Sequence, residues 1–260
     1  AARAATLGRW MALAPRARFV TTSREALRLP GERLLDLTPL AVPDVGESRL
    51  EEIARSDAVR LFIQRARESR GGFELTAEEA PRVADIVREL DGIALALELA
   101  AARMGLLSVS QLRERLPRRF ELLRGGRRDA SARQATLRGA IDWSWNLLEP
   151  VEQMALARCS VFRGGFTLDA AEAVLALPPD APDVLEVLES LRSKSLLRVL
   201  EAEGPDGERR LGQYESIRQY AAGKLRDMRG AEVLAERHAD WYLALARGLR
   251  EQVRSLGGAA

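Results

Sequence analysis

The sequence contains very few of the residues that most catalytic and metal sites require. Its 260 residues include one cysteine, Cys159, and one histidine, His238. A single cysteine excludes an intramolecular disulfide and leaves a cysteine-based zinc site without enough ligands. Because Asp and Glu are not clustered at metal-binding spacing either, an enzyme with a catalytic centre of its own is the weakest interpretation.

Long apolar runs are absent, and neither sign of charge is in clear excess. No stretch approaches the roughly 18 apolar residues of a membrane span. The first eight residues lack the order of a signal peptide and contain no initiator Met, which predicts a cytoplasmic piece of a longer protein. The 40 Lys and Arg residues nearly balance the 38 Asp and Glu residues, so overall charge predicts neither a membrane nor a nucleic acid as partner. Lysine occurs only as Lys194 and Lys224.

The first 43 residues have the pattern of the end of an α/β sheet. Ala4 to Leu13 predicts a short helix, and the β-branched run from Arg18 to Thr22 predicts a buried strand. A turn at Pro30-Gly31 precedes Leu34 to Leu37, which predicts a second short strand. A helix, a strand, a loop and a strand at this spacing are typical of the last part of a parallel sheet.

Residues 44–116 change to helical periodicity. Ser56 is a candidate N-cap for one helix, and Thr76 begins a capping-box sequence for the next. Gly92 marks the predicted end of that second helix, because a left-handed residue after a helix costs least as glycine. The alanine-rich residues 95–104 predict a further helix that packs closely on a neighbour, so this segment predicts a small helical bundle.

A linker and a second group of helices follow the bundle. Residues 117–135 are a candidate linker. The basic stretch from Arg113 to Arg138 contains nine Arg against Glu114, Glu121 and Asp129. It favours a solvated linker, and the alternative is contact with nucleotide phosphates, nucleic acid or an acidic partner domain. Helical periodicity resumes at Thr136, and two alternating runs at 195–200 and 209–214 predict a β-hairpin. Helices followed by a hairpin have the order of a winged helix, and the chain after Glu215 is helical again.

These patterns together predict a mostly α fold: the end of a parallel α/β sheet, a helical bundle, a winged helix with a β-hairpin, and C-terminal helices. The predicted domains are residues 1–43, the end of the α/β sheet; 44–133, the helical domain; 134–228, the winged helix; and 229–260, the C-terminal helical region.

Two short motifs carry chemical information. Strand ends in open parallel sheets face the ligand crevice, and Arg24, after the predicted strand end Thr22-Ser23, could reach a terminal phosphate there with two parallel hydrogen bonds. The alternative is a surface arginine. The second motif, Leu90 to Glu98, is a helix end followed at once by a helix start. Such an apolar corner can pack on an adenine ring. The alternative is that it packs only against other residues of its own helical bundle.

In order along the chain, these motifs resemble the successive landmarks of bacterial STAND/NB-ARC signalling ATPases, above all those built into large transcriptional regulators. The resemblance runs collinearly from about residue 18 to 245. It is carried by eight motifs: Val20-Thr21-Thr22-Ser23-Arg24, Leu29-Pro30-Gly31-Glu32, Asp57 to Phe62, Leu90 to Glu98, Gln134 to Arg138, Ala140 to Trp145, Val161 to Phe166, and Glu215 to Ala221.

The resemblance implies that residues 1–43 are the C-terminal remnant of a P-loop nucleotide-binding domain, that residues 44–133 are an ARC-like domain, and that residues 229–260 begin a helical repeat or linker region. It also implies roles for particular residues. Arg24, with Thr22 and Ser23 beside it, matches the sensor arginine that contacts the γ-phosphate of ATP. Gly92-Ile93-Ala94-Leu95 matches the Gly-x-Pro-Leu motif that lines the adenine pocket, with Ala94 in place of the family's proline. Tyr214 stands where related proteins have a histidine that holds the β-phosphate of ADP, and a phenol still donates one hydrogen bond.

The phosphate-gripping loop of an ATPase is missing from the sequence. A Walker A loop is Gly-x4-Gly-Lys-Ser/Thr, whereas the only Gly-Lys pair, Gly223-Lys224, is followed by Leu225. No acidic Walker B strand precedes Arg24 either. We therefore expect that the chain is not an enzyme by itself, that ATP or ADP with Mg²⁺ binds in the full-length protein, and that no nucleotide binds tightly to this chain alone.

The function implied by the resemblance is a regulatory ATP/ADP switch in a bacterial transcriptional regulator. The expected partners are a nucleotide-binding domain upstream, helical repeats downstream, and further copies of the protein on activation, with no membrane contact. The alternative functions are a winged helix that binds DNA or a helical protein-interaction module. Direct DNA binding is disfavoured because the predicted recognition helix, residues 182–193, carries Asp183, Glu186 and Glu189 against Arg192.

Overall fold

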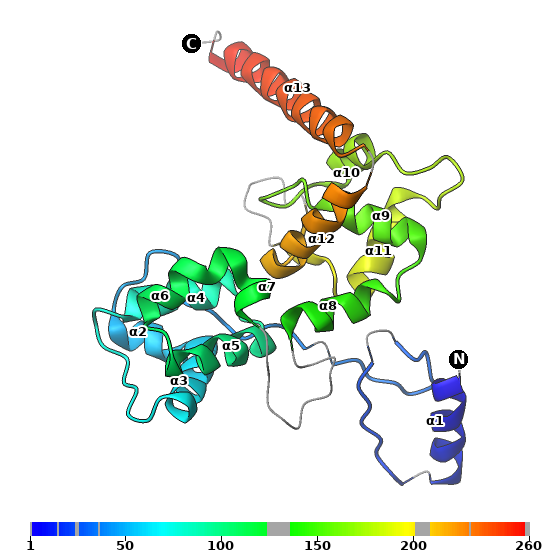
Figure 1. Ribbon diagram of the computed structural model, residues 1–260. Coiled ribbons are helices and arrows are strands. Elements are labelled where there is room, and N and C mark those ends of the chain that lie inside the picture. Colours follow the sequence, from blue (N-terminus) through cyan, green and yellow to red (C-terminus); the bar gives the residue numbers. More distant parts are fainter. Residues whose placement is uncertain are drawn as a thin grey trace.

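The structure, a computed structural model, describes residues 2–14, 16–23, 26–35, 37–123, 136–200, 209–228 and 230–257. Helices dominate it, and a two-stranded antiparallel sheet is the only sheet in these residues (Figure 1). The prediction of a mostly α fold is confirmed. No helix in the described ranges has the length and apolar character needed to span a membrane.

The N-terminal region corrects the prediction of a parallel sheet. Helix α1 (Ala2–Leu13) forms as expected, but residues 16–23, 26–35 and 37–49 contain no strand where they are described. A strand needs a neighbour to pair its backbone N–H and C=O groups, and the described part of the chain offers none here. Val20, Leu35 and Leu37 are instead 97%, 85% and 85% exposed. Residues 16–23 and 26–35 lie beside α1, away from the helical bundle (Figure 1), whereas the chain reaches the bundle from Leu40 onward.

The first helical unit, residues 50–123, follows. Its elements are α2 (Leu50–Arg55), α3 (Asp57–Ser69), α4 (Ala80–Glu89), α5 (Ala94–Ala101), η1 (Ala102–Gly105), α6 (Val109–Arg115), η2 (Leu116–Arg118) and α7 (Arg119–Leu122). Phe62 of α3, Val83 of α4 and Leu97 of α5 are fully buried between them. Because α5 is rich in alanine, α3 packs directly along it.

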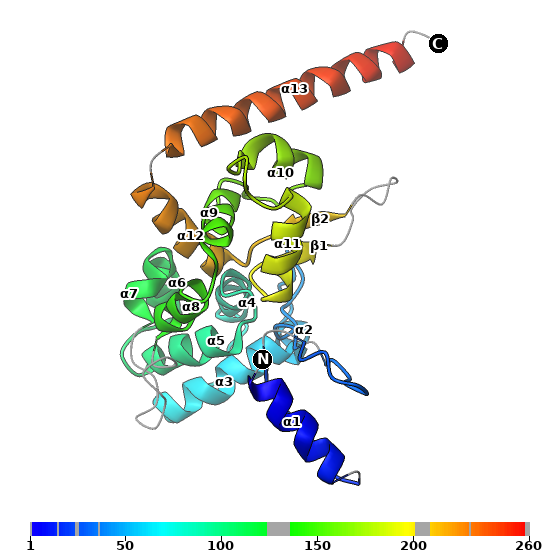
Figure 2. The same ribbon diagram turned by 90° about the vertical axis from the view of Figure 1, so that its right-hand side faces the viewer.

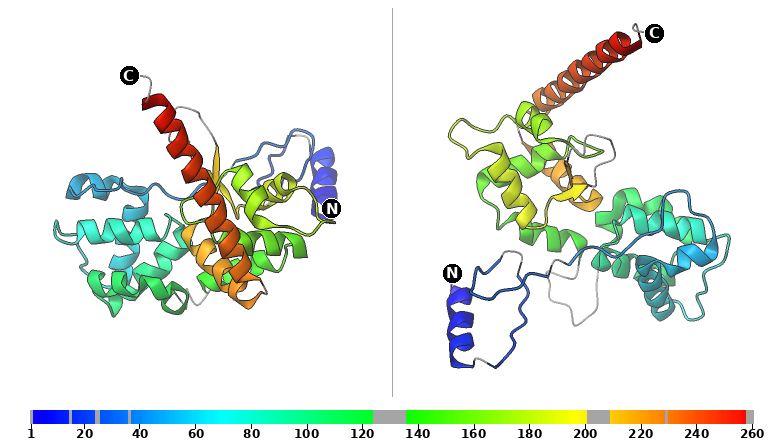
Figure 3. Two further views of the ribbon diagram at one scale, coloured as in Figure 1. Left: turned by 90° about the horizontal axis from the view of Figure 1, so that it is seen from above. Right: turned by 180° about the vertical axis from the view of Figure 1, so that it is seen from behind.

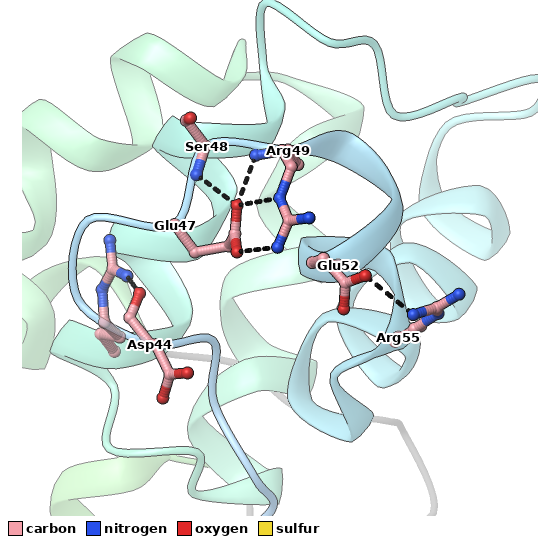
Figure 4. Close-up of polar contacts among 7 residues, drawn as sticks. Asp44, Glu47, Ser48, Arg49, Glu52 and Arg55 are labelled. Carbon is pink, nitrogen blue, oxygen red and sulfur yellow. Dashed lines mark hydrogen bonds and ion pairs between the residues drawn. The ribbon is translucent and has the colours of Figure 1, made fainter.

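The chain enters α2 through a polar turn (Figure 4). One carboxylate oxygen of Glu47 accepts hydrogen bonds from the backbone N–H groups of Ser48 and Arg49, at 2.9 and 2.8 Å, and the Arg49 side chain contacts both oxygens. These contacts hold the pKa of Glu47 at about 2, well below the ordinary value, with the Arg49 side chain as the largest cause. The turn fixes the direction in which the chain joins the bundle.

Two details of this unit differ from the sequence prediction. Ser56 precedes α3 but does not cap it, because its hydroxyl donates to the carbonyl of Ala41 at 2.6 Å. The predicted linker is partly folded, since residues 116–122 form η2 and α7, and Arg119 is only 3% exposed. Residues 124–135, the rest of the predicted linker, lie outside the described residues.

The second helical unit, residues 136–228, contains the predicted hairpin. Its elements are α8 (Leu137–Trp145), α9 (Pro150–Cys159), α10 (Leu168–Leu175), α11 (Val184–Ser193), β1 (Arg198–Leu200), β2 (Arg210–Gly212) and α12 (Glu215–Asp227). The strands pair antiparallel with Val199 opposite Leu211, which confirms the hairpin. In α8, Trp145 is 7% exposed and Trp143 41%, because residues two apart on a helix face different sides.

Side-chain contacts lock the helices of the second unit. Lys224 of α12 lies 5.2 Å from the ring centroid of Trp145 and 5.3 Å from that of Tyr220. Between α9 and α11, the buried Glu152 pairs with Lys194, and the same carboxylate oxygen accepts from Ser190 Oγ at 2.6 Å. The last helix, α13 (Ala231–Gly257), packs on α10 and then projects from the body of the molecule (Figures 2 and 3).

Candidate functional site

The turn between α4 and α5 has a backbone shape that its sequence requires. Asp91 and Gly92 both have left-handed φ values, 55° and 65°, which lets the chain reverse between two helices. Asp tolerates this region better than most residues, and Gly adopts it without steric cost. The Gly92 carbonyl accepts a hydrogen bond from Leu40 N–H at 3.0 Å, so the segment before α2 passes directly over the turn.

The start of α12 lies against this turn, although the two are 124 residues apart in sequence. The backbone N–H of Glu215 donates to Asp91 Oδ2 at 2.6 Å. The first N–H groups of a helix have no partner within the helix, and a negative charge at that end is favourable. Asp91 therefore caps a helix of the other unit.

Several further charges surround the Asp91 carboxylate. The guanidinium of Arg198 lies 4.0 Å from it. Arg119 of α7 is nearly fully buried and donates to the carbonyl of Glu89 at 2.5 Å. Glu215 binds Arg218 through both of its oxygens, at 2.8 and 2.7 Å. The contact between the two units is thus polar and charged on both sides.

Tyr214 is the residue that precedes α12 and is half-buried. Its backbone is extended, with φ −61° and ψ 144°, as expected of an N-cap position. The Arg198 guanidinium lies over its ring, 4.8 Å from the centroid, a cation–π distance. Burial raises the pKa of the Tyr214 phenol, so this group is a neutral hydrogen-bond donor at physiological pH.

The structure brings some of the predicted site residues together and leaves others apart. Gly92 is buried, Ile93 and Leu95 are half-buried, and Ala94 is exposed at the start of α5. Through the contact of Glu215 with Asp91, Tyr214 lies close to this corner. Thr22 and Ser23 are exposed, and residues 16–23 lie beside α1, away from the α4–α5 turn (Figure 1). Arg24 lies outside the described residues.

Sequence reasoning missed three residues of this contact. Asp91 was placed only within an apolar corner, and no local pattern marks it as the partner of a residue 124 positions later. Arg119 was assigned to a solvated linker, and no local pattern marks it as buried. Arg198 stands in the predicted hairpin, and only the tertiary structure places it over Tyr214 and near Asp91.

Two buried polar atoms that lack a hydrogen-bond partner among the described residues lie beside this contact. Arg119 Nε and Ser216 Oγ are both buried, and neither has a hydrogen-bond partner within the described structure. Buried polar atoms without partners are uncommon in folded proteins. As for metals, the described ranges contain no group of three or more His, Cys, Asp or Glu side chains placed to hold an ion.

The Asp91 carboxylate gives the fold a pH dependence of defined sign. Burial raises its pKa from 3.8 to about 6, against the opposing effects of Arg198, the Glu215 and Ser216 N–H groups and Arg119. The folded state therefore holds a proton that the unfolded state has lost, so this group's contribution to stability falls as pH rises from about 4 to 6. Between pH 4.5 and 7, we expect the wild type to lose about 2 kcal/mol of unfolding free energy relative to Asp91→Asn.

Urea unfolding of both proteins at the two pH values measures this difference. The comparison with Asp91→Asn cancels the other titrating carboxylates, because they are common to both proteins. Equal changes in the two proteins would show that Asp91 titrates normally.

Comparison with known proteins places the chain among relatives that are much longer. Two proteins with the name "Putative HTH-type transcriptional regulator", from Mycobacterium tuberculosis and Mycobacterium bovis, are 39% identical to it over 236 residues, which is 90% of this chain and 25% of theirs. A second protein of Mycobacterium tuberculosis, named only "Uncharacterized protein", is 37% identical over 226 residues, 86% of this chain and 54% of that one. No family model matches. Over most of its length, the chain is therefore similar to one part of mycobacterial proteins that bear the name of transcriptional regulators.

Proposed function

We propose that this chain is the regulatory part of an ATP/ADP-dependent switch in a transcriptional regulator of the STAND/NB-ARC class. The observation that carries the proposal is the contact between the α4–α5 turn and the start of α12. Two of the motifs on which the resemblance rests lie on either side of it, and unrelated helices would have no reason to bring them together. The names of the mycobacterial relatives support the regulatory role in transcription.

In this proposal the nucleotide lies between an upstream nucleotide-binding domain of the full-length protein and the first helical unit. Ile93 and Leu95 contact the adenine ring, and the Tyr214 hydroxyl donates to a phosphate. Arg24 contacts the γ-phosphate of ATP, and Mg²⁺ accompanies the nucleotide. The second helical unit acts as a lid, and each nucleotide stabilises the arrangement that it binds better. Without a Walker A lysine, the chain alone does not hydrolyse ATP.

The proposal includes partners beyond the nucleotide. Helical repeats follow α13 in the full-length protein, and activation assembles further copies of it. Direct DNA reading by α11 is not part of the proposal. Glu186 and Glu189 are exposed on that helix with Arg192 as the one exposed cation among residues 184–193, and this charge opposes binding to a phosphate backbone.

The test is nucleotide affinity in the full-length gene product. Tyr214→Phe removes only the hydroxyl, and we expect it to weaken ADP binding about tenfold, the effect of one hydrogen bond to a charged group. Arg24→Ala is expected to weaken ATP binding more than ADP binding. Isothermal titration calorimetry with each nucleotide gives both values, and Tyr242→Phe in α13 is the matched control, for which no change is expected. Wild-type protein that binds neither nucleotide would refute the proposal.

A further inference from the structure

One hydrogen bond between a side chain and the main chain joins the two helical units across 124 residues. Asp91 accepts from the first N–H group of α12, while its own backbone is held at φ 55° in the α4–α5 turn. The units also meet through α5 against α8 and through an edge-on contact of Phe120 with Tyr220, whose centroids lie 6.3 Å apart. Neither of these two contacts involves the first turn of α12.

We propose that Asp91 is a positioning residue: its carboxylate holds the start of α12, and with it Tyr214, against the α4–α5 turn. Tyr214 immediately precedes Glu215, whose N–H donates to Asp91, so the carboxylate sets where the phenol lies. Arg198 contributes from the hairpin, because it approaches both Asp91 and the Tyr214 ring. The claim that Asp91 positions Tyr214 in a nucleotide site rests on the proposed function. The contact between Asp91 and the start of α12 is testable without nucleotide.

The contact can be broken from either side with little damage to either unit. Asp91→Gly removes the carboxylate, and glycine accepts the left-handed backbone without strain. Glu215→Pro removes the first donor N–H of α12, at a helix position where proline is tolerated. The extended backbone of Tyr214 is also compatible with a following proline. Glu215→Ala is the matched control, because it loses the same side chain and keeps the N–H.

The readout is the distance between the units, measured on this chain by pulsed electron paramagnetic resonance. Gln64→Cys in α3 and Glu189→Cys in α11 place spin labels on exposed positions of the two units. Cys159 stays unlabelled because it is 1% exposed, and burial raises the pKa of its thiol. We expect one narrow distance distribution for the labelled wild-type chain and for Glu215→Ala.

For Asp91→Gly we expect a second, broader population, with the ratio of closed to open molecules lowered roughly tenfold or more, as for the loss of a charge-assisted hydrogen bond. Glu215→Pro is expected to shift the ratio in the same direction by a smaller factor, since the Asp91 carboxylate and its ion pair with Arg198 remain. In the double variant, the change in the free energy of opening is expected to be smaller than the sum of the two single changes, because both substitutions act on one interaction.

A distribution for Asp91→Gly that is identical to wild type would overturn the inference. If Asp91→Gly does not fold, the distance distributions of Glu215→Pro and Glu215→Ala are compared instead, and identical distributions for these two variants would overturn the inference. Failure of the proposed function has a different signature: Asp91→Gly opens the molecule, but wild-type full-length protein binds no nucleotide.

Discussion

Gly92→Ala is expected to lower the free energy of unfolding by about 3 kcal/mol. A Cβ atom at this position would lie 2.1 Å from the carbonyl oxygen of Leu40 and 3.1 Å from its carbon, and backbone atoms cannot move aside as a side chain end can. The left-handed conformation adds about 1–2 kcal/mol for a residue with a Cβ. Relief of the clash separates Leu40 N–H from the Gly92 carbonyl, which forfeits a further ~1 kcal/mol.

Chemical denaturation followed by circular dichroism measures this loss. Gly72→Ala is the matched control: φ is 76°, also left-handed, but nothing lies within 4 Å of the added Cβ. It should therefore show only the conformational cost. A loss for Gly92→Ala no larger than that of Gly72→Ala would mean that Leu40 does not pass over the turn in solution. In the full-length protein, Gly92→Ala is also expected to weaken nucleotide binding, because it displaces the Ile93–Leu95 corner.

Lys194→Met is expected to lower the free energy of unfolding by about 3 kcal/mol. The Glu152 side chain is 7% exposed and that of Lys194 16%, so the substitution leaves a buried carboxylate without its cation. Ser190 Oγ and the Glu149 N–H still contact Glu152, at 2.6 and 2.8 Å, but they carry no full positive charge. Arg192→Met, at an exposed position of the same helix, is the control and should change stability by less than about 0.5 kcal/mol.

The effect of Lys194→Met should depend on pH. In the wild type, burial raises the pKa of Glu152, but contacts with Lys194, Ser190 and Glu149 outweigh it and the net pKa is lowered. The stability that this lowered pKa contributes to the folded state is present above pH 4.5, and it is lost as pH falls through the folded-state pKa. In Lys194→Met only burial and the neutral donors act, so the carboxyl takes up a proton at higher pH. Denaturation at pH 7 and pH 4 should show that the difference in unfolding free energy between wild type and Lys194→Met is smaller at pH 4. The same difference at both pH values would contradict the role of the ion pair.

Local sequence patterns predicted most helices, because apolar spacing, capping residues and helix-ending residues all lie within the helix or next to it. The alanine-rich helix at residues 95–104 was predicted, and α5 with η1 covers these positions, since composition and apolar spacing are read within ten residues. The left-handed Gly92 was predicted for the same reason. The hairpin was predicted from alternation in residues 195–200 and 209–214.

The predictions from sequence are wrong where the local structure or the burial of a residue depends on residues far away in the sequence. The runs at 18–22 and 34–37 have the composition of strands, but a strand exists only when another pairs with it, and no partner is described. Arg119 was misjudged because it stands in an arginine-rich stretch, whereas its burial comes from packing between α7 and residues 30 positions earlier. For the candidate site, the sequence placed the Gly92–Leu95 corner and Tyr214 in one inferred pocket only through resemblance. The Asp91 contact that relates them spans 124 residues and leaves no local trace.

The scarcity of lysine has a practical consequence for studies of this molecule. Both side-chain amines lie in the second helical unit, Lys194 at the α9–α11 junction and Lys224 over the rings of Trp145 and Tyr220. Acetylating reagents and amine-coupling dyes will therefore react at few sites besides the chain's own amino terminus. The rate at which each lysine is modified then reports how often one particular packing contact opens, with almost no background from the rest of the surface.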